Sequence, residues 1–130
     1  MTWQLSMADN RHPVVAVTGA RGLVGEAVVR QLRESGFLVL RLSRSLLPED
    51  GSPTAILPPF DAPNSAFEKA FAGAEHIVHA AALTNADATA TETDFMNANA
   101  RLTERLARAA GRVAPGRFVL VSSIRAIAGK

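Results

Sequence analysis

The 130-residue sequence contains no cysteine and no tyrosine, and its only lysines are Lys69 and Lys130. Without cysteine there is no disulfide, no thiolate ligand for zinc and no thiol nucleophile. Without tyrosine there is no phenol to act as a general acid or base. No apolar run approaches the roughly 20 residues that cross a bilayer, and the N-terminus lacks the basic-then-apolar order of a signal peptide. We therefore expect a cytoplasmic protein with no membrane partner.

The charges are few and nearly balanced. Fourteen Lys and Arg residues stand against 12 Asp and Glu residues, which leaves a formal net charge of +2. The arginines form no cluster of the kind that binds nucleic acid, so no nucleic-acid partner is expected. Hydrophobic residues make up 48% of the chain, which suits one globular domain. We assign residues 1–12, which are polar and aperiodic, to a tail, and residues 13–130 to the domain.

Apolar runs alternate with helical periods along this domain. Strands are predicted at residues 14–17, 37–42, 54–57, 75–80 and 117–121, and helices at residues 23–34, 65–72 and 94–112. Strands that alternate with helices imply right-handed crossovers and a parallel sheet. The predicted fold class is therefore α/β, a doubly wound Rossmann sheet with strand order 3-2-1-4-5, truncated before the later strands.

The predicted helices carry distinct stripes. On the first helix an apolar stripe is expected to face the sheet, formed by Val24, Ala27, Val28 and Leu32. On the long helix four basic side chains are expected to form a solvated stripe, namely Arg101, Arg105, Arg108 and Arg112.

Three glycines at a spacing of three residues connect the first strand to the first helix. Gly19 permits the sharp turn, Gly22 lets the backbone approach a pyrophosphate at the helix N-terminus, and Gly25 lets the helix pack close to the sheet. The alternative is a glycine-rich turn without a ligand. The strand–loop–helix context favours a dinucleotide site, which we assign to the whole loop: Gly19, Arg21, Gly22, Leu23, Val24 and Gly25.

The end of the second strand bears on the choice between NAD and NADP. An aspartate there would bind the ribose hydroxyls of NAD, but this sequence has Ser43 and Arg44. Arg44 can pair with a 2′-phosphate, and Arg21 can add a second positive group. The sequence therefore favours NADP, with NAD possible and with an ordinary loop role for Arg44 as the alternative.

Three segments in this order resemble the extended and atypical short-chain dehydrogenase/reductases. They are residues 18–25, the run His79-Ala80-Ala81-Ala82 after a strand, and the run Val121-Ser122-Ser123. This group includes the NAD-dependent epimerase/dehydratase family of nucleotide-sugar enzymes. The resemblance extends from about residue 14 to residue 129.

The resemblance implies roles for further residues of the cofactor site. Asp61 resembles the aspartate that meets the adenine amino group, with Ala62 beside it, although a loop aspartate or helix cap is the alternative. The run from His79 through Ala80 and Ala81 to Ala82 resembles the segment that lines the central phosphate and the nicotinamide ribose. His79 itself is better read as a packed histidine than as a base.

The resemblance also implies catalytic residues. Asn99, four residues before Thr103, resembles the asparagine that holds a water and proton relay beside the cofactor, and a buried polar pair is the alternative. Ser123 resembles the serine that hydrogen-bonds the substrate oxygen, with Val121 and Ser122 next to it at the cofactor. An ordinary serine at a strand end is the alternative.

One part of the family pattern is missing. The Tyr-x-x-x-Lys pair that exchanges a proton with the substrate is not in this chain, so whether the chain alone is an enzyme stays uncertain. We expect a fragment, a truncated product or a natural half-domain that binds cofactor without turnover.

The function expected from the resemblance is hydride transfer at a hydroxyl or keto carbon of a sugar-like small molecule. The expected enzyme is an NAD(P)-dependent epimerase, dehydratase or reductase, to which this chain supplies cofactor binding. The alternative is a non-catalytic NAD(P)-binding module or cofactor sensor. A homo-oligomer is expected as well, because the fifth strand (residues 117–121) would be an apolar, unpaired edge.

Overall fold

The computed structural model describes residues 12–81 and 89–123. Of the predicted tail only His12 is described, so the assignment of residues 1–12 to a tail lies almost wholly outside this range. Ala82, one of the predicted cofactor contacts, also lies outside it.

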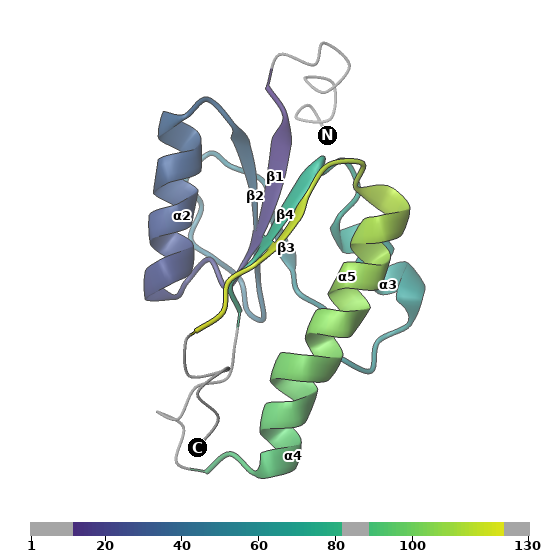
Figure 1. Cartoon of the computed structure of the whole chain (residues 1–130). Helices are drawn as coiled ribbons and strands as arrows, with labels where there is room; N and C mark the ends of the chain where they lie inside the picture. The colour runs from purple at the N-terminus through teal and green to yellow at the C-terminus, as the bar shows by residue number, and fades with distance from the viewer. Residues whose placement is uncertain (1–11, 82–88, 124–130) are drawn as a thin grey trace.

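The described chain forms one parallel sheet of five strands in the order β3-β2-β1-β4-β5, which confirms the predicted Rossmann topology. The strands are β1 (Val14–Thr18), β2 (Leu38–Ser43), β3 (Thr54–Ile56), β4 (His76–His79) and β5 (Phe118–Leu120). Their carboxyl ends point to the lower edge of the sheet in Figure 1. Residues that follow different strands therefore meet along that edge.

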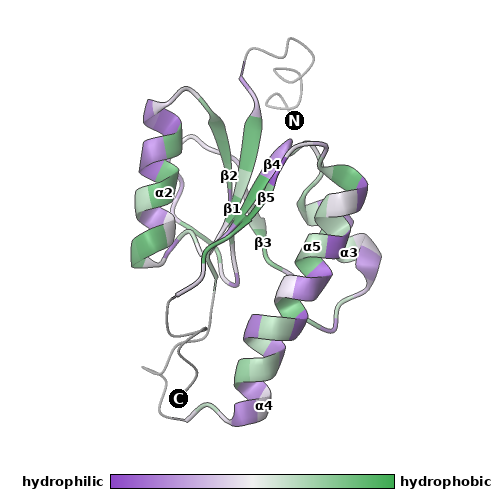
Figure 2. Ribbon diagram, in the orientation of Figure 1, coloured by the Kyte–Doolittle hydropathy of each residue, from purple (hydrophilic) through white to green (hydrophobic). Residues whose placement is uncertain are grey.

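Helices cover both faces of the sheet. Helix α2 (Leu23–Glu34) lies on one face, and helices α3 (Asn64–Ala70) and α5 (Leu102–Val113) lie on the other (Figure 1). All five residues of β1 are buried, as a central strand between two layers requires. Figure 2 shows β1 and β2 as largely hydrophobic ribbons without the alternation of a half-exposed strand.

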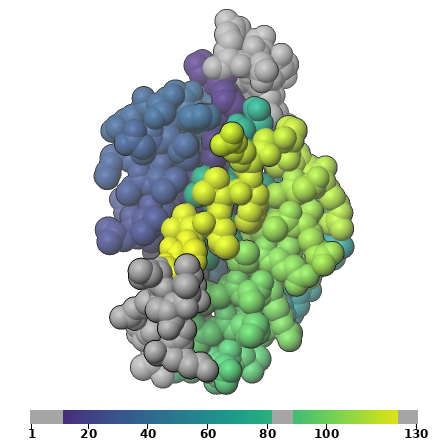
Figure 3. All heavy atoms as spheres, viewed as in Figure 1, coloured from purple at the N-terminus to yellow at the C-terminus, as the bar shows by residue number. Residues whose placement is uncertain are grey.

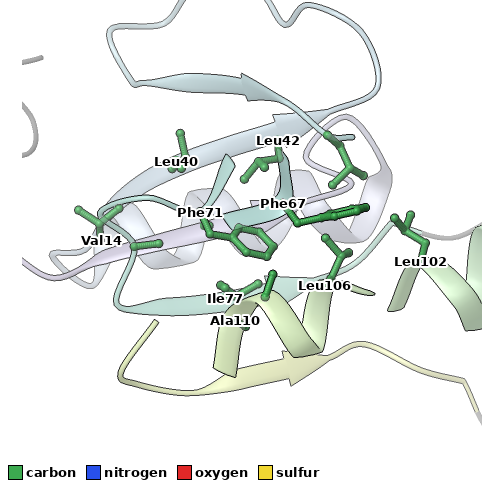
Figure 4. Close-up of a cluster of buried hydrophobic side chains, with 13 residues drawn as sticks. Val14, Leu40, Leu42, Phe67, Phe71, Ile77, Leu102, Leu106 and Ala110 are labelled. Carbon is green, nitrogen blue, oxygen red and sulfur yellow. The ribbon is translucent and has the colours of Figure 1, made fainter. Parts of the chain in front are cut away.

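The larger core lies between the sheet and helices α3 and α5. Phe67 and Phe71 fill its centre with no exposed surface, and Leu106 of α5 packs beside them (Figure 4). Burial of each such side chain contributes roughly 1.5–3 kcal/mol. This core holds α5 against the sheet and thereby places the preceding residues of the same helix at the sheet's carboxyl edge.

The stripe predicted for α2 is wrong by one residue. Val24 is 51% exposed and Ala27 is exposed, whereas Gly25 and Val29 are the buried residues of the helix. The reason is that Gly25 must lie against the turn at Gly19, which rotates the helix by one position. Val28 and Leu32 still pack against the smaller core.

The long helix begins earlier than predicted and is not regular throughout. It starts as α4 (Glu92–Phe95), continues as a π-helical stretch η2 (Met96–Arg101) and ends as α5. Thr91 and Asp94 form a capping box that fixes its start. In the π-helical stretch the N–H at Leu102 bonds to the carbonyl of Asn97, five residues earlier. Such a turn carries one extra residue and shifts the phase of the helix.

The predicted solvated stripe of arginines is also wrong at one position. Arg105 is half-buried; its guanidinium donates to the carbonyl oxygens of Phe60 and Ala62 at 2.9 and 2.5 Å and lies 4.9 Å from the ring centroid of Phe67. It thus fixes the segment before α3 to α5. Arg101, Arg108 and Arg112 are exposed, as predicted. In the described part of the chain no helix is both long and apolar enough to span a membrane.

Candidate functional site

The glycine loop makes the tightest approach in the fold. Gly19 has a φ of +69°, and a Cβ atom there would lie 2.6 Å from the backbone nitrogen of Ala81. A Cβ atom on Gly25 would collide with the carbonyl of Gly19. Both glycines are therefore required by packing, as predicted for the turn and for the helix that follows it.

Gly22 differs from the other two glycines of the loop. It is the N-cap of α2 with a φ of −74°, and a Cβ there would meet only the carbonyl oxygen of Gly19, at 3.3 Å. The fold therefore tolerates a side chain at Gly22 far better than at Gly19 or Gly25. Gly22 has no side chain to cap α2, so among the described residues the N–H groups of the first turn are left to an anion at the positive end of the helix.

A cavity of about 370 Å³ opens over this loop at the carboxyl edge of the sheet. Its floor is the glycine loop and its walls come from the ends of β2 and β4 and from the long helix. The lining residues are Gly19, Arg21, Gly22, Ser43, Arg44, Ser45, Leu57, Ala80, Ala81, Ala98 and Leu102. Two of them are arginines and none is acidic, so the described lining suits a phosphate-bearing ligand. We name this the phosphate cavity.

A second cavity of about 540 Å³ adjoins the first and shares Arg44, Leu57, Ala98 and Leu102 with it. Its remaining lining is mostly apolar: Ile56, Pro58, Pro59, Phe60, Thr89, Ala90, Asp94 and Asn97. The side-chain oxygen of Asn97 is buried, and no described donor reaches it. A flat, apolar ring system fits this lining, because the ring would cover the apolar walls. We name this the apolar cavity.

The segment that carries Arg44 is tied to the glycine loop. Arg21 donates from Nη1 to Oγ of Ser45 at 2.7 Å, across the mouth of the phosphate cavity. Ser43 is buried at the end of β2, and Arg44 is exposed beside it. The two predicted arginines thus lie at one cavity, as the sequence indicated.

His79 lies behind the phosphate cavity and is only 1% exposed. Its Nδ1 is 2.6 Å from Oγ1 of Thr18 and its Nε2 is 2.9 Å from Oγ1 of Thr103. Burial lowers the pKa of His79 to about 4, so the ring is neutral near pH 7. It is a packed, hydrogen-bonded histidine, which agrees with the reading preferred from the sequence.

Several predicted contacts do not reach the two cavities. Leu23 and Val24 are exposed at the start of α2 and line neither cavity, so only their backbone N–H groups, in the first turn of the helix, remain as candidate contacts. Asp61 is exposed in the turn before α3, and neither it nor Ala62 lines a cavity. At the end of β3 the cavities are lined instead by Leu57. The role expected for Asp61 toward adenine therefore has no support from its position.

The predicted catalytic residues lie near the cavities without lining them. Asn99 belongs to the π-helical stretch, where Asn97 and Ala98 are the lining residues. Ser122 and Ser123 lie two and three residues beyond the end of β5 and are exposed. Val121 donates its backbone N–H to the carbonyl of His79 at 3.0 Å, which continues the pairing of β5 with β4. Ser123 thus lies at the carboxyl edge of the sheet, where it was expected.

Some residues of the site were not predicted from the sequence. Leu57 is the last residue of a predicted strand, and Ser45 lies three residues after another, so both could have been expected at the carboxyl edge of the sheet. Asn97 was not identifiable, because its orientation depends on the π-helical turn, whereas Ala98 and Leu102 are four residues apart and share a helix face by their spacing alone. Thr18 was missed because its partners, Ala80, Ala81 and His79, are distant in sequence. No three described His, Asp or Glu residues are grouped to hold a metal.

The sequence matches the NAD dependent epimerase/dehydratase family over residues 15–130. A search of the curated proteins finds no match. Among solved structures the chain is similar to MoeE5 in complex with UDP-glucuronic acid and NAD, at 29% identity and a TM-score of 0.67. The match covers 84% of this chain and 36% of MoeE5.

Two further structures share the fold. Uronate dehydrogenase from Agrobacterium tumefaciens, solved with NAD, matches at 22% identity and a TM-score of 0.69, over 86% of this chain and 41% of its own. L-threonine dehydrogenase from Clostridium difficile matches at 24% identity and a TM-score of 0.74, over 89% of this chain and 38% of its own. The chain thus spans about 40% of the length of such neighbours. With the glycine loop, the adjoining cavities and a family match over nearly all of its length, the chain belongs to the NAD dependent epimerase/dehydratase family.

Proposed function

We propose that this chain is the cofactor-binding part of an NAD(P)-dependent enzyme that transfers hydride at a hydroxyl or keto carbon of a sugar-like substrate. The observation that carries the proposal is the pair of adjoining cavities over the glycine loop, one with two arginines and one mostly apolar. A dinucleotide has the matching parts, a charged pyrophosphate and ribose beside a flat adenine. The complex of MoeE5 with UDP-glucuronic acid and NAD, at 29% identity, supports a sugar-like substrate.

Each part of the cofactor has candidate partners in the described chain. The first turn of α2 and the backbone at Gly22 would hold the pyrophosphate. Ser43, Arg44 and Arg21 would hold the adenosine ribose and a 2′-phosphate, which favours NADP over NAD. Asn97 and Leu57 would contact the adenine. When bound, the nicotinamide supplies the hydride donor or acceptor.

Catalysis by this chain's own residues is assigned to the carboxyl edge near β5. Ser123 would donate a hydrogen bond to the substrate oxygen and stabilise charge that develops there. Asn99, on the long helix, would help to hold a water beside the cofactor. The membership in the epimerase/dehydratase family and the dehydrogenases among its neighbours speak against a purely non-catalytic module.

The first test is binding of NADPH to the chain and to Gly22→Val. A valine at Gly22 keeps an allowed backbone conformation, because the φ is negative, and its Cβ would meet only the carbonyl oxygen of Gly19, at 3.3 Å, which has to give slightly. The branched side chain would instead occupy the approach of the pyrophosphate, so binding should be lost while the thermal midpoint changes little. Calorimetry, or energy transfer from the single tryptophan, reports binding.

The control is Gly36→Ala, a glycine of positive φ in the turn after α2, away from both cavities. It should cost stability and leave binding unchanged. The second arm is a hydride-transfer assay, in which Ser123→Ala should lower the rate. Equal NADPH affinities of Gly22→Val and the parent would show that the cofactor does not bind at the glycine loop.

A further inference from the structure

A chain of hydrogen bonds crosses the molecule behind the phosphate cavity. Backbone N–H groups of Ala80 and Ala81 donate to Oγ1 of Thr18 at 3.1 and 3.2 Å. Thr18 is 2.6 Å from Nδ1 of His79, and Nε2 of His79 is 2.9 Å from Oγ1 of Thr103. Thr103 donates its hydroxyl to the carbonyl oxygen of Asn99 at 2.5 Å. The chain therefore begins at the ends of β1 and β4 and finishes in the π-helical stretch.

The partners along this chain favour one direction for each bond. The Thr18 hydroxyl already accepts two N–H groups, so its single hydrogen is donated to Nδ1 of His79. Nε2 of His79 then carries the ring hydrogen and donates it to Thr103, whose own hydrogen goes to Asn99. The imidazole is held neutral in one tautomer, with one acceptor and one donor in use. A second ring proton would face the hydrogen of Thr18.

The groups at the two ends of the chain flank the same cavity. Thr18 precedes Gly19, and Ala80 and Ala81 line the phosphate cavity from the sheet side. Asn99 and Thr103 alternate along the helix with Ala98 and Leu102, which line the cavity from the helix side. The ring of His79 also packs against Phe118 of β5, with 6.3 Å between ring centroids, so it has little freedom to move.

We propose that His79 is a positioning residue for cofactor binding, a rigid two-sided spacer that sets the opening between the sheet edge and the π-helical turn. The proposal rests on the proposed function, since it assumes that the cavity between these walls binds a dinucleotide. A ring with hydrogen bonds at both ends fixes distance and orientation together, which a purely apolar side chain cannot do. The spacer would thereby hold Asn97 and Ala98 in the positions in which they line the cavities.

Glutamine is the matched replacement for the imidazole. Its amide oxygen and nitrogen share one carbon, as the two ring nitrogens of histidine do, so it can accept from Thr18 and donate to Thr103. His79→Gln should therefore bind NADPH within about two-fold of the parent. His79→Leu keeps bulk but removes both bonds, and one or two buried hydrogen bonds are worth about ten-fold in affinity. Thr103→Val, which keeps the shape of threonine, should weaken NADPH binding similarly.

A double variant tests whether His79 acts on NADPH binding through Thr103 or only by being buried. If His79 acts through Thr103, His79→Leu combined with Thr103→Val should weaken NADPH binding no more than either change alone. The control is His76→Gln, at the amino end of β4, where Nδ1 of His76 accepts from the backbone of Arg117. This control should leave NADPH binding unchanged. Additive losses, or a folded His79→Leu that binds like the parent, would overturn the proposal.

A second measurement does not depend on cofactor binding. Nitrogen NMR of the free chain should show His79 with a protonated Nε2 and a bare Nδ1, and Thr103→Val should change the Nε2–H signal. If His79→Leu fails to fold, Thr103→Val and His79→Gln still decide the question through binding. A His79 ring protonated on Nδ1 contradicts the spacer. A chain with the expected tautomer that binds neither NADPH nor NADH instead contradicts the proposed function.

Discussion

At the scale of single residues, the positions around the phosphate cavity divide by whether the fold or a ligand requires them. Gly19 and Gly25 are required by packing, because a side chain at either would strike backbone atoms. Gly22 and Arg44 are tolerant positions: Gly22 has the extended backbone of an N-cap residue, with a negative φ, and Arg44 is exposed. Substitutions at the tolerant positions therefore report on the ligand with little change in the fold.

Arg44 carries the prediction on cofactor choice. The chain should bind NADPH about five-fold or more tightly than NADH, because an arginine–phosphate pair that is partly exposed is worth about 1 kcal/mol. Arg44→Ala should remove the preference by weakening NADPH alone. Raising the salt concentration should reduce the preference in the parent, since exposed charges are screened. Calorimetric titration with both cofactors measures these affinities.

The control for this change is Arg117→Ala. It removes the same charge just before β5, at the amino ends of the strands and so on the side of the sheet away from Arg44. It should leave the ratio of the two affinities unchanged. Equal affinities of the parent for NADPH and NADH at low salt would show that Arg44 does not bind the 2′-phosphate of the ribose. The solved neighbours with bound NAD make this a sharp comparison.

At the scale of elements, the segment after β2 is held by one carboxylate. Asp50 accepts from Nη2 of Arg33 on α2 at 2.6 Å and from the backbone of Ser52 at 3.0 Å, and it lies 3.0 Å from Nη2 of Arg41 on β2. Partial burial would raise the pKa of Asp50, but the hydrogen bonds from Arg33 and Ser52 and the charge of Arg33 outweigh it and leave the pKa below 3.8.

A lowered pKa has a defined consequence for stability. The contribution of the Asp50 carboxylate is present above its unfolded pKa and is lost as the pH falls through the lower, folded pKa. Asp50→Asn should therefore lower the free energy of unfolding by about 0.5–1 kcal/mol at pH 7, a range set by the partial exposure of the pair. The difference from the parent should shrink below about pH 4.

Urea unfolding at several pH values measures this difference in the free energy of unfolding. Glu49→Gln is the neighbouring control, because Glu49 is exposed and is not part of the clamp, the name we give to Asp50 with Arg33, Arg41 and Ser52. A loss of stability that stays constant between pH 7 and pH 3 would show that Asp50 acts by packing and not by charge. Because the clamp holds the segment that follows Arg44, Asp50→Asn should also weaken NADPH binding slightly.

At the scale of the whole molecule, the two edges of the sheet differ. β3 has three residues and is followed closely by Pro58 and Pro59, which cannot donate to a further strand. The edge at β5 exposes apolar side chains: Val119 is 47% exposed and Leu120 is 51% exposed. Figure 3 shows this strand, in yellow, at the molecular surface. An uncovered apolar edge of this kind invites pairing with another strand.

We expect the 130-residue chain to self-associate through β5. Leu120→Lys should shift its mass in light scattering toward the monomer at equal concentration, because a charged side chain opposes edge pairing. Leu46→Lys is the control, since Leu46 is 81% exposed in the segment after β2 and lies far along the chain from the edge. A parent chain that stays monomeric at high concentration would refute this expectation.

The order of the elements, the parallel sheet and the place of the glycine loop could all be predicted from the sequence. These follow from features that are local along the chain: the apolar runs of β1 and β2, the helical period after Gly22, and the position of serine and arginine at the end of β2. Parallel topology then brings Gly22, Ser43 and Ala80 to one edge without any knowledge of side-chain contacts.

The details that depend on partners distant in sequence could not be predicted and became visible in the folded chain. The π-helical turn shifts the helix phase so that Asn97 lines the apolar cavity, while Asn99 bonds to Thr103. The guanidinium of Arg105 is drawn inward by carbonyls some 45 residues earlier, at Phe60. His79 gains its fixed tautomer from Thr18, 61 residues away. Such contacts arise when packed layers bring polar groups together in the interior, where each must find a partner, and no local pattern records them.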